Sequence, residues 1–237
     1  MFIGWAIGGA AVGLLAGNVM RGTVFHHSVR TSDALRTTCP HCGAPWRFKW
    51  AAVSGCCGCG KRNDPPAGLL EIATAVALAA IAGVLGPRAE LIGFGWLAVA
   101  GIALAAIDLR THRLPNRLIY PAYAAVLISF LLGAFAGTDP ARVERSLLGA
   151  VILGGSYLVL AVIAPGQLGL GDVKLAGLLG LALAWVSWQT LLFGGCLAFL
   201  LSAGVSLLLL ATRRITLKSA IPFGPFMLAG AALALLG

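Results

Sequence analysis

The sequence has 237 residues, of which 59% are hydrophobic and 11% are charged, and its mean hydropathy is +0.93. Soluble domains carry about 25% charged residues, so this composition excludes a soluble globular protein and favours a polytopic membrane protein. A formal net charge of +9 could indicate binding to nucleic acid. The basic residues, however, lie mostly in the loops between apolar runs, and we expect no nucleic-acid partner.

Apolar runs predict the helices, because a membrane-spanning helix needs roughly 20 apolar residues. The runs cover 2–20, 69–87, 91–107, 118–136, 146–165, 175–211 and 220–236. No basic segment precedes the first run, so we expect a retained helix and not a cleaved signal. The sixth run has 37 residues and would reach about 55 Å as one helix, too long for a single pass. A break near 187–190 then gives an all-α polytopic fold with about eight transmembrane helices.

The distribution of lysine and arginine predicts the orientation. The loops on one side hold 14 of the 17 basic residues, and they are 21–68, 108–117, 166–174 and 212–219. The opposite side holds Arg88, Arg142 and Arg145. Because cytosolic loops are enriched in these residue types, we expect the basic loops in the cytosol and both termini outside. A basic rim also suits anionic membrane lipids, which we expect as partners.

The loop at 21–68 carries two CxxC pairs. Cys39 and Cys42 form the first, Cys56 and Cys59 form the second, and 13 residues separate them. Each pair offers two thiolates on one tight turn, which suits tetrahedral zinc, and the reducing cytosol disfavours disulfides. We therefore predict a closed, structural zinc site in a small cytosolic zinc-ribbon-like loop. Cys57 could replace Cys56 as a ligand, and four thiols without metal are the alternative.

Two carboxylates fall at the predicted cytosolic ends of helices. Asp108 ends the third apolar run, and Asp172 follows Gly169 and Gly171 where the sixth run begins. Two close carboxylates share one proton, so that one activates water and the other donates to a carbonyl oxygen, as in aspartic proteases. The helix dipole favours an ionised Asp172 at an N-terminus and a protonated Asp108 at a C-terminus. The two glycines leave room for a close backbone approach.

Structural roles are the alternatives for the same residues. Asp172 could be a plain N-cap, and Lys174 a snorkelling side chain. Asp108 could be an interfacial residue paired with Arg110. The competing function is a proton-coupled transporter with both aspartates as a relay, and a third reading is a zinc-ribbon scaffold without chemistry. Carriers usually place such carboxylates near the membrane midplane, whereas both lie at one rim here, which favours hydrolysis.

The motifs around both aspartates resemble those of the type IV prepilin peptidase family, relatives of the GxGD membrane proteases. The first family motif is an Asp followed after five residues by Ile/Leu-Pro-Asn/Asp, and its counterparts are Asp108, Leu114, Pro115 and Asn116. The second is GxGDxK, matched by Gly169, Gly171, Asp172 and Lys174. The cysteine loop, "GNV" at 17–19 and "IPFGPFMLAG" at 221–230 are also similar to the family's pattern, so the resemblance covers most of the chain.

The resemblance implies an aspartic endopeptidase with Asp108 and Asp172 as catalytic residues. Its substrates would be prepilin or pseudopilin precursors, whose basic leader is cut at the cytosolic face of the inner (cytoplasmic) membrane. Many family members with the cysteine loop also methylate the new N-terminus with S-adenosylmethionine. The chain would divide into a first transmembrane helix at 1–20, a cytosolic four-cysteine loop at 21–68 and a seven-helix peptidase core at 69–237.

The run after Cys59 departs from the family's pattern. It reads "KRNDPPAGLLE", which keeps Glu71 but lacks the family's aromatic residue, and this weakens the expectation of methylation but not of cleavage. We expect Glu71 to be a methyltransferase or substrate contact. Since the leader and the cytosolic rim are both basic, local acidic residues are the candidates for leader recognition, and they include Asp33, Asp64 and Glu71.

Overall fold

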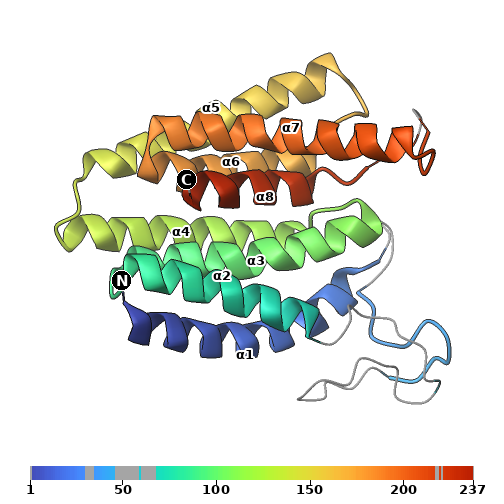
Figure 1. Cartoon of the computed structure of the whole chain (residues 1–237), viewed down its shortest axis with the longest axis horizontal. Coiled ribbons are helices and arrows are strands. Elements are labelled where there is room, and N and C mark those ends of the chain that lie inside the picture. Colours follow the sequence, from blue (N-terminus) through green and yellow to red (C-terminus); the bar gives the residue numbers. More distant parts are fainter. Residues whose placement is uncertain are drawn as a thin grey trace. The chain divides into compact units, whose positions relative to one another are not determined.

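The computed structural model describes residues 2–29, 35–45, 59, 68–216, 219 and 221–236 (Figure 1). In these ranges the chain forms eight α-helices and no β-strand, apart from an isolated bridge between Thr38 and Pro45. The helices are α1 (Ile3–His27), α2 (Leu69–Leu85), α3 (Glu90–Thr111), α4 (Asn116–Phe135), α5 (Ala141–Ile163), α6 (Leu170–Val186), α7 (Trp188–Ala211) and α8 (Gly224–Leu236). The prediction of an all-α polytopic membrane protein is confirmed.

Five of these helices are long and apolar enough to cross a membrane, namely α1, α3, α4, α5 and α7, while α2 and α8 are shorter apolar helices. The outer face of α5 exposes large apolar side chains, including Val151, Val162 and Ile163. Such a face suits contact with lipid, because exposing large apolar side chains to water is energetically unfavourable. The chain divides into two compact units, Met1–Thr111 and His112–Gly237, each built from consecutive helices.

In the first unit, α1 and α2 lie side by side along their length (Figure 1). Gly9, Gly13 and Gly17 recur every four residues on α1 and allow backbone contact, since a Cβ on Gly13 would lie 2.5 Å from the carbonyl oxygen of Thr74. The Thr74 hydroxyl donates to the Gly13 carbonyl oxygen at 2.6 Å and joins the helices. The helix α1 continues past the first apolar run to His27, so Arg21, counted above with a loop, is helical.

In the second unit, α6 is the central helix. Every residue from Leu175 to Trp185 is buried, and α6 contacts α4, α5, α7 and α8. Gly149 of α5 and Gly180 of α6 bring two backbones together, because a Cβ on Gly180 would lie 2.3 Å from the Gly149 carbonyl oxygen. A helix enclosed in this way has its position fixed by neighbours on all sides.

Both ends of α6 are defined by specific contacts. At the C-terminal end, the Arg145 guanidinium donates to the carbonyl oxygens of Ala184, Trp185 and Val186 at 2.5, 2.6 and 3.0 Å. These carbonyls lack partners within the helix, so a guanidinium there acts as a cap and complements the helix dipole. Ser187 then adopts an extended backbone, and its Oγ accepts from the Thr190 N–H at 3.0 Å. The predicted break near 187–190 is confirmed.

Candidate functional site

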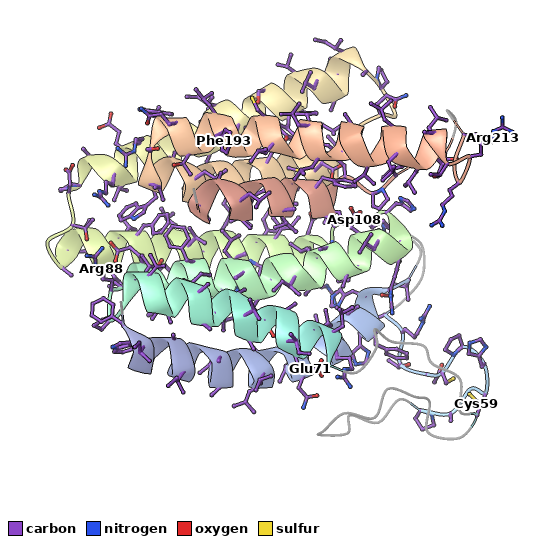
Figure 2. The ribbon with its side chains drawn as sticks, viewed as in Figure 1. Cys59, Glu71, Arg88, Asp108, Phe193 and Arg213 are labelled. Atoms are coloured by element: carbon purple, nitrogen blue, oxygen red, sulfur yellow. The ribbon has the colours of Figure 1, made fainter. Side chains whose placement is uncertain are left out.

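Asp108 lies in the last turn of α3, in the first unit. Its side chain is almost fully enclosed, with 4% of the residue exposed. Figure 2 shows Asp108 and Glu71 at the same end of the three-helix unit and Arg88 at the other end. This is the arrangement expected within this unit if the basic loops share one membrane face. Asp108 is therefore an enclosed residue at a helix end and not a solvated surface residue.

Asp172 lies in the first turn of α6, in the second unit. Its Oδ2 accepts from the Gly169 N–H at 3.0 Å, and the Asp172 N–H in turn donates to the Gly169 carbonyl oxygen at 3.0 Å. Gly169 is therefore the N-cap and Asp172 is the third residue of the helix, so Asp172 supports the capping turn from inside the helix and is not the plain N-cap considered above. The residue is half-buried and adjoins the exposed Gly169, and a capped N-terminal turn favours the ionised carboxylate.

The second unit brings the Leu-Pro-Asn part of the first motif, residues 114–116, against the GxGDxK motif. Leu114 packs on Gly171, where a Cβ would lie 3.1 Å from the Leu114 Cβ, so a larger residue would push the two segments apart. Asn116 lies opposite Lys174, whose Nζ donates to its Oδ1 at 3.0 Å. Pro115 precedes α4 with φ −68°, the value its ring imposes, and its carbonyl oxygen accepts from the Leu118 N–H at 3.0 Å.

Two tyrosines beside this motif pair were missed by sequence reasoning. Tyr120 places its ring under the Lys174 ammonium, with 5.5 Å between Nζ and the ring centroid. The Tyr123 hydroxyl donates to the backbone carbonyl oxygen of Lys174 at 2.8 Å. The available signal was their spacing, since they stand four and seven positions after Asn116 and so share its helix face. Lys174 therefore has defined partners on α4, and its contact with Asn116 is open to solvent.

Glu71 has a structural environment at the start of α2. One carboxylate oxygen pairs with the Arg21 guanidinium of α1, and the other accepts from the Gly68 N–H at 3.0 Å. Both side chains of the ion pair are mostly buried, at 6% and 13% exposure. The pair fastens α1 to α2 at the point where the chain leaves for the cysteine segment (Figure 2). A role of Glu71 in methylation or substrate contact remains a prediction.

Three of the predicted metal ligands come together. The Sγ atoms of Cys39, Cys42 and Cys59 lie within 4.8 Å of one another, and Cys39 and Cys59 are 3.9 Å apart. Tetrahedral thiolates at about 2.3 Å from zinc lie about 3.8 Å apart, so this cluster could hold a metal ion. The His41 N–H donates to the Cys39 Sγ at 3.4 Å, a contact within the turn that carries Cys39 and Cys42. The predicted fourth ligand Cys56, its alternative Cys57, and the acidic residues Asp33 and Asp64 lie outside the described residues.

The fold and these helix-end carboxylates define a polytopic α-helical membrane protein with an acidic residue at a helix end in each unit. The sequence pattern of the type IV leader peptidase family matches residues 91–212, which include both aspartates. The chain belongs to this family.

Curated relatives agree with this assignment. The chain is 32% identical to the "Prepilin leader peptidase/N-methyltransferase" of Burkholderia pseudomallei over 83% of its own length and 65% of that protein. Proteins of the same name from Aeromonas hydrophila and Pseudomonas aeruginosa are 31% and 30% identical, over 85% and 84% of this chain and 71% of each relative. The chain thus spans about two thirds of these relatives' length. No solved structure matches it significantly.

Proposed function

We propose that the protein is an aspartic endopeptidase that removes the basic leader from prepilin or pseudopilin precursors. The observation that carries the proposal is the packing of the Leu-Pro-Asn part of the first family motif against the second motif in the second unit, through Leu114 with Gly171 and Asn116 with Lys174. Six positions along the chain separate Asp108 from Leu114. The relatives' printed name supports the substrate class.

Asp172 and Asp108 would divide the chemistry of hydrolysis. The ionised Asp172 takes a proton from water, whose oxygen attacks the scissile carbonyl carbon while the protonated Asp108 donates its proton to the carbonyl oxygen. The tetrahedral diol then collapses and the C–N bond breaks. The proton held by Asp172 passes to the leaving amine, and one diol hydroxyl returns its proton to Asp108. Burial of Asp108 and capping of Asp172 support this division of roles.

The reaction would occur at the cytosolic face of the inner membrane. Arg145 caps α6 at the end opposite to Asp172, as the predicted orientation requires if Arg145 faces outward and Asp172 faces the cytosol. The precursor's apolar helix would dock among the protein's own helices, and the basic loops would contact anionic lipid headgroups. A nucleic-acid partner has no part in this function.

Methylation of the new N-terminus is a second proposed activity, because the relatives are named as N-methyltransferases as well. S-adenosylmethionine would supply the methyl group. The three-thiolate cluster of Cys39, Cys42 and Cys59 fits structural zinc, which would order the segment between α1 and α2. Glu71 lies at the base of this segment, and its proposed contact with the cofactor or the substrate N-terminus would coexist with its bonds to Arg21 and to the Gly68 N–H.

Cleavage of a purified type IV prepilin by the detergent-solubilised chain tests the proposal, with the products read by mass spectrometry. Asp108→Asn and Asp172→Asn should each lower the cleavage rate by about 100-fold or more, because each removes a proton-transfer group. Asp139→Asn is the matched control, since Asp139 caps α5 on an exposed loop and an asparagine keeps that cap. A chain that leaves prepilin intact but moves protons in vesicles would support the transporter instead.

A further inference from the structure

The first turn of α6 is held at three points, all within the second unit. The Gly169 N–H donates to Asp172 Oδ2, and Leu114 packs on Gly171. The third point is Lys174, two positions after Asp172. The family motif accounts for the glycines and the aspartate as parts of an active site, but it gives no chemical reason for the lysine.

Lys174 contacts three residues on one face of α4. Its Nζ donates to Asn116 Oδ1 at 3.0 Å and lies 5.5 Å from the centroid of the Tyr120 ring, a cation–π distance. Its backbone carbonyl oxygen accepts from the Tyr123 hydroxyl at 2.8 Å. The same hydroxyl lies over Gly177, where a Cβ would be 2.3 Å away, so Gly177 is the residue that admits it. We call Asn116, Tyr120 and Tyr123 the α4 cradle.

We propose that the α4 cradle makes Lys174 a positioning residue for Asp172, an inference that rests on the proposed peptidase function. Asp172 and Lys174 share one helical turn, so rotation or sliding of that turn moves both side chains together. The cradle holds the side chain and the backbone of Lys174 and thereby fixes the direction of the Asp172 carboxylate. Misplacement of a reacting group by about 1 Å can cost about 100-fold in rate, so a small loosening is enough to matter.

The contacts argue against two simpler roles for Lys174. A snorkelling lysine extends its ammonium toward water, whereas this one donates to an amide oxygen and lies over an aromatic ring. A purely electrostatic role would need only a positive charge near Asp172 and would not depend on the partners of the ammonium. The cradle instead predicts dependence on hydrogen-bond geometry, with coupling between Lys174 and Asn116.

The test measures kcat and KM for cleavage of a purified type IV prepilin by detergent-solubilised variants, with thermal unfolding as a check on folding. Lys174→Met should lower kcat by about tenfold or more with KM within about twofold, because positioning acts on the reacting geometry and not on substrate binding. Lys174→Arg should restore most of kcat, since its guanidinium can donate to Asn116 and stack on Tyr120. Arg117→Met, which removes a positive charge from the same turn of α4, should leave kcat unchanged.

A double-mutant cycle tests the coupling directly. Asn116→Ala combined with Lys174→Met should be no worse than Lys174→Met alone, because both break the same contact. Tyr123→Phe is nearly isosteric and should lower kcat by about threefold at an unchanged melting temperature, since the Lys174 carbonyl keeps its helical partner. This variant keeps the inference testable if Lys174→Met fails to fold.

Four results would overturn the inference, and they differ from a failure of the proposed function. Equal losses for Lys174→Met and Arg117→Met would indicate a general charge effect. A Lys174→Arg variant as slow as Lys174→Met would indicate that the lysine itself takes part in the chemistry. Additive losses in the cycle would exclude coupling, and an unchanged kcat for Tyr123→Phe would exclude the backbone contact. If the unmodified chain cleaves no prepilin, or Asp172→Asn cleaves normally, the peptidase proposal itself fails.

Discussion

The two units of this protein differ in the charged groups that they bury: among the described residues, the buried charged side chains, Arg21, Glu90 and Asp108, all belong to the first unit. In the unit formed by α1, α2 and α3, charged and polar side chains are enclosed and paired, as with Arg21 and Glu71, and Thr74 is fully buried. In the unit formed by α4 to α8, the central helix α6 buries apolar side chains along its length, and its polar residues gather in an accessible first turn. Both units use glycines to bring backbones together, so close packing does not distinguish them.

This difference indicates which changes each unit tolerates. A buried ion pair is sensitive to loss of one charge, because the remaining charge is left without compensation. A helix enclosed on all sides is sensitive to added volume, because neighbours cannot move away independently. The first unit should therefore respond strongly to charge deletion, whereas added methyl groups should destabilise either unit wherever glycines bring backbones together. The first turn of α6 gains its fixed position from the second kind of packing.

The largest effect should follow from deleting the buried charge of the first unit. Arg21→Met leaves Glu71 enclosed without its partner and should lower the free energy of unfolding by about 3 kcal/mol. Denaturant unfolding of the detergent-solubilised protein measures this. The double variant Arg21→Met, Glu71→Gln should recover part of the loss, and Arg88→Met, at an exposed position in the same unit, should have almost no effect. Equal losses for Arg21→Met and Arg88→Met would contradict the comparison.

A smaller effect, of opposite sign at two positions, should follow from single methyl groups in the second unit. Gly180→Ala places a Cβ against the Gly149 carbonyl and should lower the free energy of unfolding by about 1–3 kcal/mol. Gly155→Ala adds the same group on α5 where nothing lies within 4 Å, and it should raise stability by about 0.5 kcal/mol through helix propensity. The same unfolding measurement decides this prediction, and a loss of stability at both positions would contradict it.

The helices were largely predictable because apolar length is a one-dimensional signal. The 37-residue run had to break, and Ser187 was a suitable place since its side chain can cap the following helix. The extension of α1 to His27 was missed because a charged residue after an apolar run indicates a loop. Arg21 is instead helical and is paired with Glu71 of α2. Burial of a charge depends on a partner 50 positions away, which no local pattern reveals.

The candidate site was predictable in its residue types and less so in its contacts. The motifs identified Asp108, Asp172 and Lys174, but the purpose of the lysine depends on α4. Tyr120 and Tyr123 were missed because tyrosines near a predicted membrane interface usually act as anchors, so their presence indicated nothing specific. Arg145 was similarly read as an outward loop charge, although it lies in α5 and caps the end of α6.

A still smaller loss of stability is expected from removing Arg145, which caps the C-terminal end of α6 in the second unit. Arg145→Met removes three hydrogen bonds to the last carbonyls of α6, which we expect to lower the free energy of unfolding by about 1–2 kcal/mol, because the half-exposed site lets water replace part of the contact. Arg142→Met is the matched control, three positions earlier on the same helix and exposed. If the two arginine variants are equally stable, the cap contributes nothing.

The smallest effect on the helices should come from the cysteine segment, which is joined to the first unit by local contacts. Two hydrogen bonds join α1 to the segment. The Arg36 N–H donates to the His26 carbonyl oxygen at 3.0 Å, and the His26 Nδ1 lies 2.5 Å from the Arg36 carbonyl oxygen. If the cluster holds zinc, a chelator should speed proteolysis between 35 and 45 while changing the free energy of unfolding of the helices by less than about 0.5 kcal/mol, because the metal would order this segment and not the helix contacts. As the control, metal analysis of the protein before and after treatment should show that the chelator has removed the zinc.

Cys39→Ser should abolish zinc binding, because it removes one of the three clustered thiolates, whereas Cys196→Ser, on an exposed part of α7, should leave the zinc content unchanged. Equal zinc content in both variants would exclude the cluster as the metal site. If a chelator instead unfolds the helices, the first unit depends on its cysteine segment as strongly as on the Arg21–Glu71 pair. Packing of the helices would then not be independent of the metal-bound segment.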